Sequence, residues 1–307
     1  MDISLALGGG GIRGVAHIGV LRALETHKFN IKAIAGTSAG GLVGAVYAAG
    51  YSTEKIEKVM KDIDQDRSFS RKPDDSPSLL GLGNLSSKLS ELLSDYTFDD
   101  LKIPFTATAV SLHTGKQINL HKGKVLDAVL ATIAIPGVFP SQEIGGRVLI
   151  DGGVMDPVPI QVARWMRPDL PVVAVLLHRK PENYVSENID IPLPITAPTN
   201  ILDTLNKLRP VQAFKIFSRS MEVSSRHMTE LAVKLYKPEV IIAPPVGHIG
   251  VLQNVDVDEL ITAGINATEK TLTKIESEAN WMKNMQRSVR HRVNPDPIPD
   301  YWDNLDY

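Results

Sequence analysis

Short apolar runs alternate along this chain with segments whose apolar positions recur every three or four residues. Ile3 to Leu7 is an apolar run typical of a buried strand, and Ile12 to Leu24 has apolar residues at helical spacing. The same order follows at once, with an apolar strand over 32–35 and a small-residue helix over 39–49. Strands that alternate with helices in this way predict an α/β protein with a mostly parallel sheet.

The rest of the chain continues this alternation. We predict further strands at 104–112, 117–121, 147–150, 171–177 and 239–243, and helices at 53–63, 125–133, 158–166, 201–235 and from 256 towards 292. Residues 64–83 are rich in Asp, Ser, Pro and Gly and predict a long loop, which in a compact domain is usually functional. We interpret 179–235 as a cap over the sheet edge. A single domain is therefore expected over 1–275, with the end of the last helix and a tail over 276–307.

A serine stands where the second strand meets its helix. Ser38 is the centre of the pentapeptide 36–40, Gly-Thr-Ser-Ala-Gly, which fits G-x-S-x-G. In that turn small neighbours let the backbone bend sharply and present the hydroxyl. The turn also places Ser38 at a helix N-terminus, where free N–H groups and the positive dipole end stabilise an oxyanion. Alone, the pattern fits an ordinary tight turn equally well.

Four consecutive glycines, Gly8 to Gly11, follow the first strand. Together with Gly14 they satisfy G-x-G-x-x-G, but a dinucleotide site needs an acidic residue after the second strand, where this chain has the serine turn. A phosphate-binding loop is excluded because Val15 and Ala16 stand where Lys and Ser or Thr are required. Parallel strands would bring these glycine N–H groups to the same sheet edge as Ser38. The alternative is that the glycines only permit close packing of helix and strand.

A carboxylate, Asp151, follows the predicted strand 147–150 and precedes two glycines. The residues alone leave two arrangements open. In the first arrangement, Ser38 and Asp151 form a triad with a late histidine, for which His248 is well placed. In the second, Asp151 is itself the base of a dyad. A carboxylate near its solution pKa of about 3.9 is a poor base for serine, so a dyad requires desolvation. An ordinary Asp-Gly turn is the structural alternative.

Three motifs in this order resemble the patatin-like phospholipase family. They are Gly-Gly-Gly-Gly-Ile-Arg-Gly at 8–14, Gly-Thr-Ser-Ala-Gly at 36–40 and Asp-Gly-Gly at 151–153, with Ala-Ile-Pro at 134–136 before the last. The resemblance is most specific over 5–166. It implies a three-layer α/β/α fold with a mostly parallel central sheet and a helical cap, and a Ser-Asp dyad with no catalytic histidine and no cofactor.

The resemblance also assigns roles to single positions. It implies Ser38 as the nucleophile, Asp151 as the base, and the N–H groups of Gly9, Gly10 and Gly11 as the oxyanion hole. Arg13 stands where members carry Lys or Arg, and we expect it to stabilise the loop and to contact a phosphate or carboxylate; an ordinary surface arginine is the alternative. The supporting positions are Gly14, Gly36, Gly40, Gly152 and Gly153.

Composition narrows the remaining possibilities. The 307 residues are 43% hydrophobic and 22% charged, which is typical of a soluble globular protein, and the net charge of −2 argues against a nucleic-acid partner. Without cysteine there is no disulfide, thiolate metal site or thiol nucleophile, and the histidines show no metal-binding spacing. No apolar stretch reaches the roughly 18 residues of a spanning helix, and the amino terminus does not read as a secretion signal. We expect a cytoplasmic protein that contacts membrane surfaces at most transiently.

Two side-chain groups lie outside these motifs. His17, among apolar residues of the first helix, predicts a buried, hydrogen-bonded core histidine rather than a catalyst. The last predicted helix carries aromatic, sulfur and basic side chains that suit a membrane interface. We nevertheless expect the apolar ones to pack on the core and the arginines to be solvated; the residues are Trp281, Met282, Met285, Arg287, Arg290 and Arg292.

The sequence thus predicts a serine esterase that acts on acyl-lipid esters through an acyl-enzyme. The alternative is a lipid- or acyl-binding regulatory protein whose hydrolase site is vestigial. An acyl-lipid is the expected ligand in either case, and no metal or other cofactor is expected.

Overall fold

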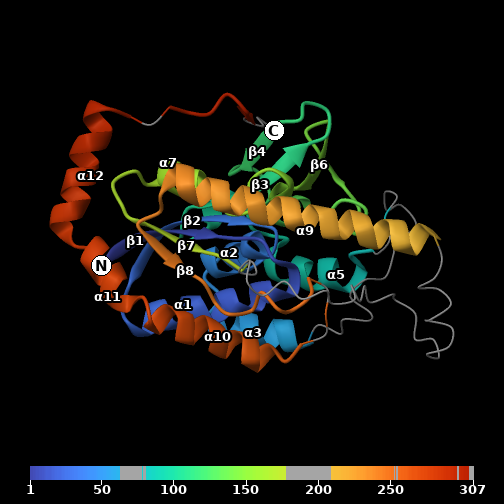
Figure 1. Ribbon diagram of the computed structural model, residues 1–307, viewed down its shortest axis with the longest axis horizontal. Helices are drawn as coiled ribbons and strands as arrows, with labels where there is room; N and C mark the ends of the chain where they lie inside the picture. The colour runs from blue at the N-terminus through green and yellow to red at the C-terminus, as the bar shows by residue number, and fades with distance from the viewer. Residues whose placement is uncertain are drawn as a thin grey trace.

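A mixed β-sheet forms the centre of the molecule (Figure 1). The structure is a computed structural model, and it describes residues 1–62, 78, 81–177, 209–251, 253, 255–295 and 297–303. In the described residues the strand order is β5-β6-β3-β2-β1-β7-β8, and β4 and β9 continue the sheet beside β3. Since β1, β2, β3, β7 and β8 are mutually parallel, their carboxyl ends meet at one edge.

The parallel strands form the most buried part of the sheet. They are β1 (Asp2–Leu7), β2 (Asn30–Thr37), β3 (Phe105–Ser111), β7 (Val172–Val175) and β8 (Val240–Ile242). Every residue of β3 and β7 is buried, as expected of strands covered on both faces. The antiparallel members are β4 (Gln117–Leu120), β5 (Gln142–Ile144) and β6 (Arg147–Asp151), and β9 (Trp302–Asp303) pairs in parallel with β4.

Helices cover both faces of the sheet, as Figure 1 shows with α1, α3 and α10 below it and α7 and α9 above it. The first layer consists of α1 (Ala16–Thr26), α2 (Ala39–Ala48), α3 (Thr53–Asp62), α5 (Gly83–Leu93), α6 (Val125–Thr132) and α10 (Val257–Glu269). The second layer holds α7 (Ile160–Met166) and α9 (Arg209–Tyr236), and α11 (Leu272–Glu278) and α12 (Trp281–Val293) follow α10. Short 3-10 turns η1 (Gly11–Val15), η2 (Phe98–Asp100) and η3 (Gly152–Val154) complete the elements.

The predicted fold class is confirmed, since a mostly parallel sheet lies between two helical layers. Each strand predicted from the pattern is present, whereas α5, β5 and β9 were not predicted. The single helix predicted from 256 towards 292 is wrong, because the backbone breaks near 270 and 280 into α10, α11 and α12. At the second break the Asn280 side chain accepts a hydrogen bond from the Lys283 N–H at 2.9 Å and so starts a new helix.

Two regions of the sequence analysis fall wholly or partly outside the described residues. The predicted loop over 64–83 does so except for residues 78 and 81–83, and within it Leu82 is buried in the core. The predicted cap over 179–235 is described from residue 209 onward, where it is the helix α9. The domain limits at 275 and 276 stay a prediction.

Candidate active site

Ser38 lies at a strained turn between β2 and α2. Its φ is 54°, a left-handed value that a non-glycine residue adopts at some cost, and its side chain is almost fully buried. The flanking glycines allow the turn, because a Cβ on Gly36 would lie 2.6 Å from the Gly40 carbonyl oxygen. A Cβ on Gly40 would lie 2.2 Å from the carbonyl oxygen of Leu7. The small residues of the predicted motif are therefore required by close backbone contact.

Strand pairing brings Asp151 to the level of this turn. Thr37, which precedes Ser38, pairs with Thr108 of β3, and the next residue of β3, Ala109, pairs with Asp151. The strand β6 runs antiparallel to β3, so it reaches the carboxyl edge of β2 from the opposite direction. The register of three neighbouring strands thus places the serine and the carboxyl side by side.

The Asp151 carboxyl is buried and interacts directly with the serine. Burial raises its pKa to about 6, and the Ser38 side chain and the hydrogen bond from the Gly153 N–H act in the opposite direction. The Gly153 N–H donates to Oδ1 at 2.7 Å. No histidine is among the groups that perturb this carboxyl in the described part of the chain. A carboxylate with a pKa near 6 is a much better base than one in water.

Gly152, the residue after Asp151, lies in close contact with β3. A Cβ on Gly152 would lie 2.2 Å from Thr108 Oγ1, so the chain can pass β3 only with glycine here. That threonine oxygen is itself within 2.7 Å of Thr37 Oγ1, which donates to the Asp156 carbonyl oxygen at 2.8 Å. These contacts fix the two turns relative to one another.

The glycine loop lies directly beside Ser38. A Cβ on Gly9 would come within 3.2 Å of the Ser38 Cβ, and one on Gly14 within 2.4 Å of the Ala39 Cβ. The Gly9 N–H donates to the Pro157 carbonyl oxygen at 2.9 Å and is occupied there. Among the described residues the N–H groups of Gly10 and Gly11 have no acceptor. Of the three amides predicted for an oxyanion hole, Gly10 and Gly11 are thus the two that remain available.

His17 forms a hydrogen bond with the backbone of this glycine loop. Its Nε2 lies 2.8 Å from the Gly8 carbonyl oxygen and therefore carries the proton that it donates. Burial lowers the pKa of His17 to about 4, so the ring is neutral near neutral pH. The histidine is buried and hydrogen-bonded, as predicted.

Arg13 fastens the loop to the helix α9. It is buried, its Nε donates to the Ile249 carbonyl oxygen, and its Nη2 lies 2.7 Å from Glu222 Oε1. Burial alone would raise the pKa of Glu222, but the hydrogen bond and the charge of Arg13 hold that pKa below its ordinary value. The carboxylate that Arg13 contacts is therefore that of Glu222 in the same chain.

Two backbone anchors of the site were not predicted. Thr132 Oγ1, at the end of α6, accepts the Ser38 N–H at 2.9 Å, and the Ala134 carbonyl oxygen accepts the Asp151 N–H at 2.9 Å. Residues 132–134 therefore accept hydrogen bonds from the backbone N–H groups of both Ser38 and Asp151. The Ala-Ile-Pro motif at 134–136 marked this region in the sequence without indicating its contacts.

A second buried carboxyl, Asp156, was also missed. Burial raises its pKa to about 7, and its Oδ2 accepts from Gln117 Nε2 at 3.3 Å. Its position three residues after the Gly152–Gly153 pair gave no signal in the sequence.

A strand-to-helix serine, a buried carboxyl in contact with it and free loop amides are the geometry expected of an α/β serine hydrolase. The chain belongs to the patatin-like phospholipase family. The family's sequence model, described as "Patatin-like phospholipase", matches residues 5–164, slightly more than half of the chain.

Several known proteins are similar to this chain. An uncharacterized NTE family protein of Mycobacterium tuberculosis (strain ATCC 25618 / H37Rv) is 37% identical over 177 residues, which cover 57% of this chain and 49% of that protein. Lysophospholipase NTE1 of Cryptococcus neoformans is 31% identical over 188 residues, 53% of this chain and 10% of that protein. The chain thus spans at most about half the length of these two curated relatives.

The fold is also similar to that of VipD from Legionella pneumophila. The crystal structure of that protein matches with a TM-score of 0.52 and 12% identity, over 90% of this chain and 67% of that chain. This likeness concerns the fold alone.

Neither a metal-binding cluster nor a membrane-spanning helix is found among the described residues. They include no group of three or more His, Asp or Glu side chains that would hold a metal ion. No helix among them combines the length and apolar character needed to cross a bilayer.

Proposed function

We propose that this protein hydrolyses acyl esters of lipids, with Ser38 as nucleophile and Asp151 as general base. The observation that carries the proposal is the strand register that sets Asp151 beside Ser38, so that the serine side chain acts on a buried carboxyl whose pKa is raised to about 6. Membership of the patatin-like phospholipase family supports a lipid ester as the substrate. The name of the relative lysophospholipase NTE1 favours a phospholipid or lysophospholipid among such esters.

The reaction proceeds in two steps. Ser38 Oγ attacks the ester carbonyl while Asp151 takes its proton, and the tetrahedral oxyanion accepts hydrogen bonds from the Gly10 and Gly11 N–H groups. The carbonyl–oxygen bond to the alcohol then breaks, Asp151 returns the proton to the departing alcohol, and an acyl ester of Ser38 remains. In the second step Asp151 removes a proton from water, and the resulting hydroxide attacks the acyl group. The bond between the acyl carbon and Ser38 Oγ then breaks, Asp151 returns the proton to Ser38 Oγ, and the fatty acid leaves.

Fluorophosphonate labelling tests the nucleophile. The wild-type protein should be labelled at Ser38, and Ser38→Ala should be neither labelled nor active on a short-chain nitrophenyl ester. Asp151→Asn should lose at least 100-fold in kcat, the lower range for general base catalysis. Matched controls are Ser4→Ala, which removes a buried serine of β1, and Asp156→Asn, which removes the other buried carboxyl.

His248→Ala separates the dyad from a triad. It should retain activity, and a loss comparable to that of Asp151→Asn would assign the base to the histidine. Full activity of a correctly folded Ser38→Ala protein would refute the proposal. An unlabelled Ser38 in a folded wild-type protein would instead favour the acyl-binding regulatory alternative.

The substrate is identified by comparing lipids released or consumed by the wild type and by Ser38→Ala. Purified protein is incubated with phospholipids, lysophospholipids and neutral glycerides, and free fatty acid is measured by mass spectrometry. Fatty acid released only by the wild type identifies the ester class. Release from none of the three, with short-chain esterase activity intact, would contradict a lipid substrate.

A further inference from the structure

The helix α12 is amphipathic, but its apolar face is turned toward solvent, whereas a surface helix of an ordinary soluble domain turns its apolar face toward the core. Its apolar side chains recur every four residues along one face, with one more beside them. They are between 54% and 80% exposed, whereas an apolar helix face normally packs on the core. The members of this face, which we name the α12 apolar face, are Trp281, Met282, Met285, Val289 and Val293. The expectation that the first of these pack on the core is wrong.

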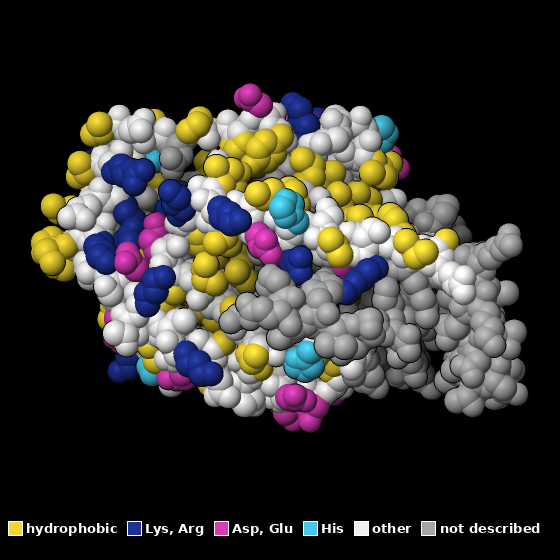
Figure 2. All heavy atoms as spheres, in the orientation of Figure 1, with side chains coloured by type: hydrophobic (Ala, Val, Ile, Leu, Met, Phe, Trp, Pro, Cys, Tyr) yellow, Lys and Arg dark blue, Asp and Glu magenta, His cyan; other side chains and the backbone are white. Residues whose placement is uncertain are grey.

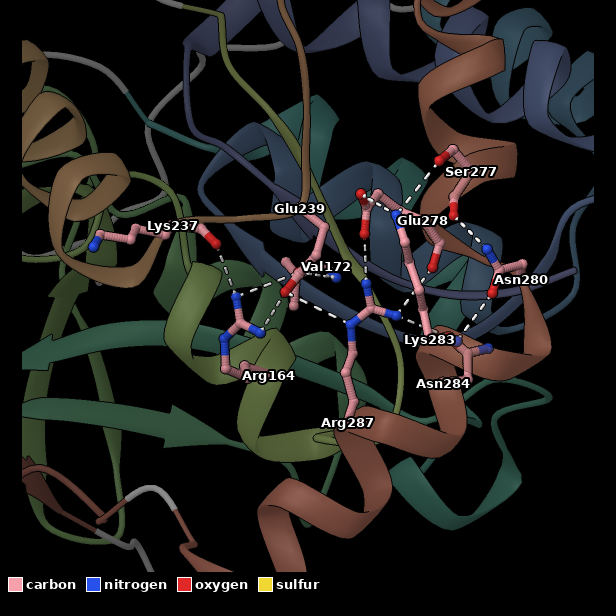
Figure 3. Close-up of polar contacts among 10 residues, drawn as sticks. All are labelled: Arg164, Val172, Lys237, Glu239, Ser277, Glu278, Asn280, Lys283, Asn284 and Arg287. Carbon is pink, nitrogen blue, oxygen red and sulfur yellow. Dashed lines mark hydrogen bonds and ion pairs between the residues drawn. The ribbon is translucent and has the colours of Figure 1, made fainter.

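The polar face of α12 is the one that contacts the body of the protein. Arg287 Nη2 lies 2.7 Å from Glu278 Oε2, and its Nη1 donates to the Glu278 carbonyl oxygen at 3.0 Å. Lys283 Nζ reaches the other oxygen of the same carboxylate at 2.8 Å. Figure 3 shows how these cations converge on Glu278 from α12. The prediction of solvated arginines is therefore wrong for Arg287, whose side chain is 15% exposed.

A second contact fixes the helix to the sheet. Arg287 Nε lies 3.8 Å from Glu239 Oε1, and that carboxylate also accepts from Arg164 Nη1 at 2.9 Å and from the Val172 N–H at 2.8 Å (Figure 3). Glu239 immediately precedes β8, and Val172 begins β7. The helix α12 is thus held at the amino edge of the parallel strands, opposite the edge that carries Ser38.

The outward face combines this apolar stripe with positive charge. The thirteen residues of α12 include no Asp or Glu, and of their four Lys or Arg only Lys283 and Arg287 pair with Glu278. Arg290 and Arg292 are exposed and have no ion pair among the described residues. In Figure 2 hydrophobic side chains mark the left-hand end of the molecule, where Figure 1 places α11 and α12.

We propose that α12 is a membrane-docking helix whose apolar face enters the headgroup region of an anionic lipid surface. Apolar and aromatic side chains on one face with arginines at its border are the composition of helices that lie in that region. The absence of acidic residues disfavours a second copy of the same helix as the occupant, because Arg290 and Arg292 would meet their own copies. The proposal is independent of the proposed hydrolase activity.

Binding to vesicles tests the docking helix directly. Ser38→Ala protein, used so that no lipid is consumed, is sedimented with vesicles of phosphatidylcholine alone or with 30% phosphatidylglycerol. Binding should require the anionic lipid and should weaken as salt is raised. Each arginine near such a surface contributes about fivefold, so Arg290→Ser with Arg292→Ser should weaken binding about 25-fold. Met285→Glu with Val289→Glu should abolish it.

Matched controls distinguish docking from a general loss of charge or apolarity. Lys116→Ser with Lys124→Ser removes two exposed cations elsewhere, and Leu112→Glu places a charge at another exposed apolar site. Both controls should bind as the parent does. In an otherwise wild-type background all four variants should hydrolyse a soluble short-chain ester equally, since α12 is remote from Ser38.

Three results would overturn the proposal. One is equal binding to neutral and anionic vesicles, and another is binding that survives Met285→Glu with Val289→Glu in a folded protein. The third is a dimer in light scattering that the same pair of substitutions dissociates, because the α12 apolar face would then be an interface between copies.

Discussion

Replacing Asp151 by Asn should make the protein more stable at pH 8 while it abolishes ester hydrolysis. Asn has nearly the same shape, and its amide oxygen can still accept the Gly153 N–H that Asp151 Oδ1 accepts at 2.7 Å. It carries no charge to desolvate. The wild-type carboxyl is buried, and its pKa is raised from 3.8 to about 6. The stability gain and the loss of activity therefore have the same cause.

The sign and size follow from proton binding. Between about pH 4 and pH 6 the native state holds a proton that the unfolded chain releases, so the free energy of unfolding of the wild type falls as pH rises. Two pKa units correspond to about 3 kcal/mol, reached in full above about pH 7. About half of that is present at pH 5. The Asn variant does not titrate, so its advantage should grow by about 1.5 kcal/mol from pH 5 to pH 8.

Urea unfolding of both proteins at pH 5 and pH 8 measures this difference. The wild-type curve alone is uninformative, because His17, with its pKa lowered to about 4, contributes stability that is lost as pH falls below about 6.5. Subtracting wild type from variant removes that opposing effect. A difference that stays constant between pH 5 and pH 8 would show that the carboxyl is not desolvated, and the account of its basicity would fail with it.

Further predictions concern the groups around this carboxyl. The kcat/KM for a nitrophenyl ester should fall tenfold per pH unit below about pH 6, because Asp151 must be ionised; a flat profile down to pH 4.5 would contradict this. Thr132→Val leaves the buried Ser38 N–H without its acceptor and should cost about 1–3 kcal/mol in urea unfolding, and Thr132→Ser should restore it. His17→Phe removes the hydrogen bond to the glycine loop, so it should lower kcat and weaken the acid sensitivity of stability below pH 6.5, and an unchanged kcat would refute the positioning role. Gly152→Ala should lower the free energy of unfolding by about 1–3 kcal/mol, because its Cβ would lie 2.2 Å from a buried threonine oxygen; a wild-type melting temperature would show that this contact relaxes.

The parts of the fold that the sequence predicted are those with short-range signals. A buried strand, a small-residue turn and a helix appear in order around Ser38, and each follows from apolar spacing and glycine placement. The helix α5 was missed because its first residues are Gly, Asn, Leu, Ser and Ser, which are mostly poor helix formers. Its stability comes from packing, since Leu89 and Leu93 are fully buried in the core.

The helix α12 shows a different limit. Its period correctly indicates that one face is apolar, but a period does not tell which face meets the protein. That was decided by Glu239, more than forty residues earlier in the sequence, and by Glu278. An apolar face is assigned to the core by default because burial is the dominant stabilising term. Here ion pairs on the polar face hold the helix instead.

Two anchors of the site are backbone carbonyl oxygens and could not be predicted from residue types. Pro157 and Ala134 contribute backbone carbonyl oxygens, which every residue possesses, and only the fold brings them to the N–H groups of Gly9 and Asp151. The sequence could therefore predict which side chains meet at the site, but not which loop amide was already occupied.

A raised pKa does not by itself identify the base. Asp156 is buried and its pKa, about 7, is raised further than that of Asp151. Its carboxyl, however, accepts from Gln117 and from the Val158 N–H, and it does not interact with Ser38. Of the two carboxyls, only Asp151 combines desolvation with an interaction with the serine whose proton must be removed. Because both carboxyls are destabilised by burial, comparing Asp151→Asn with Asp156→Asn separates the two effects: both should raise stability at pH 8, and only the first should abolish hydrolysis.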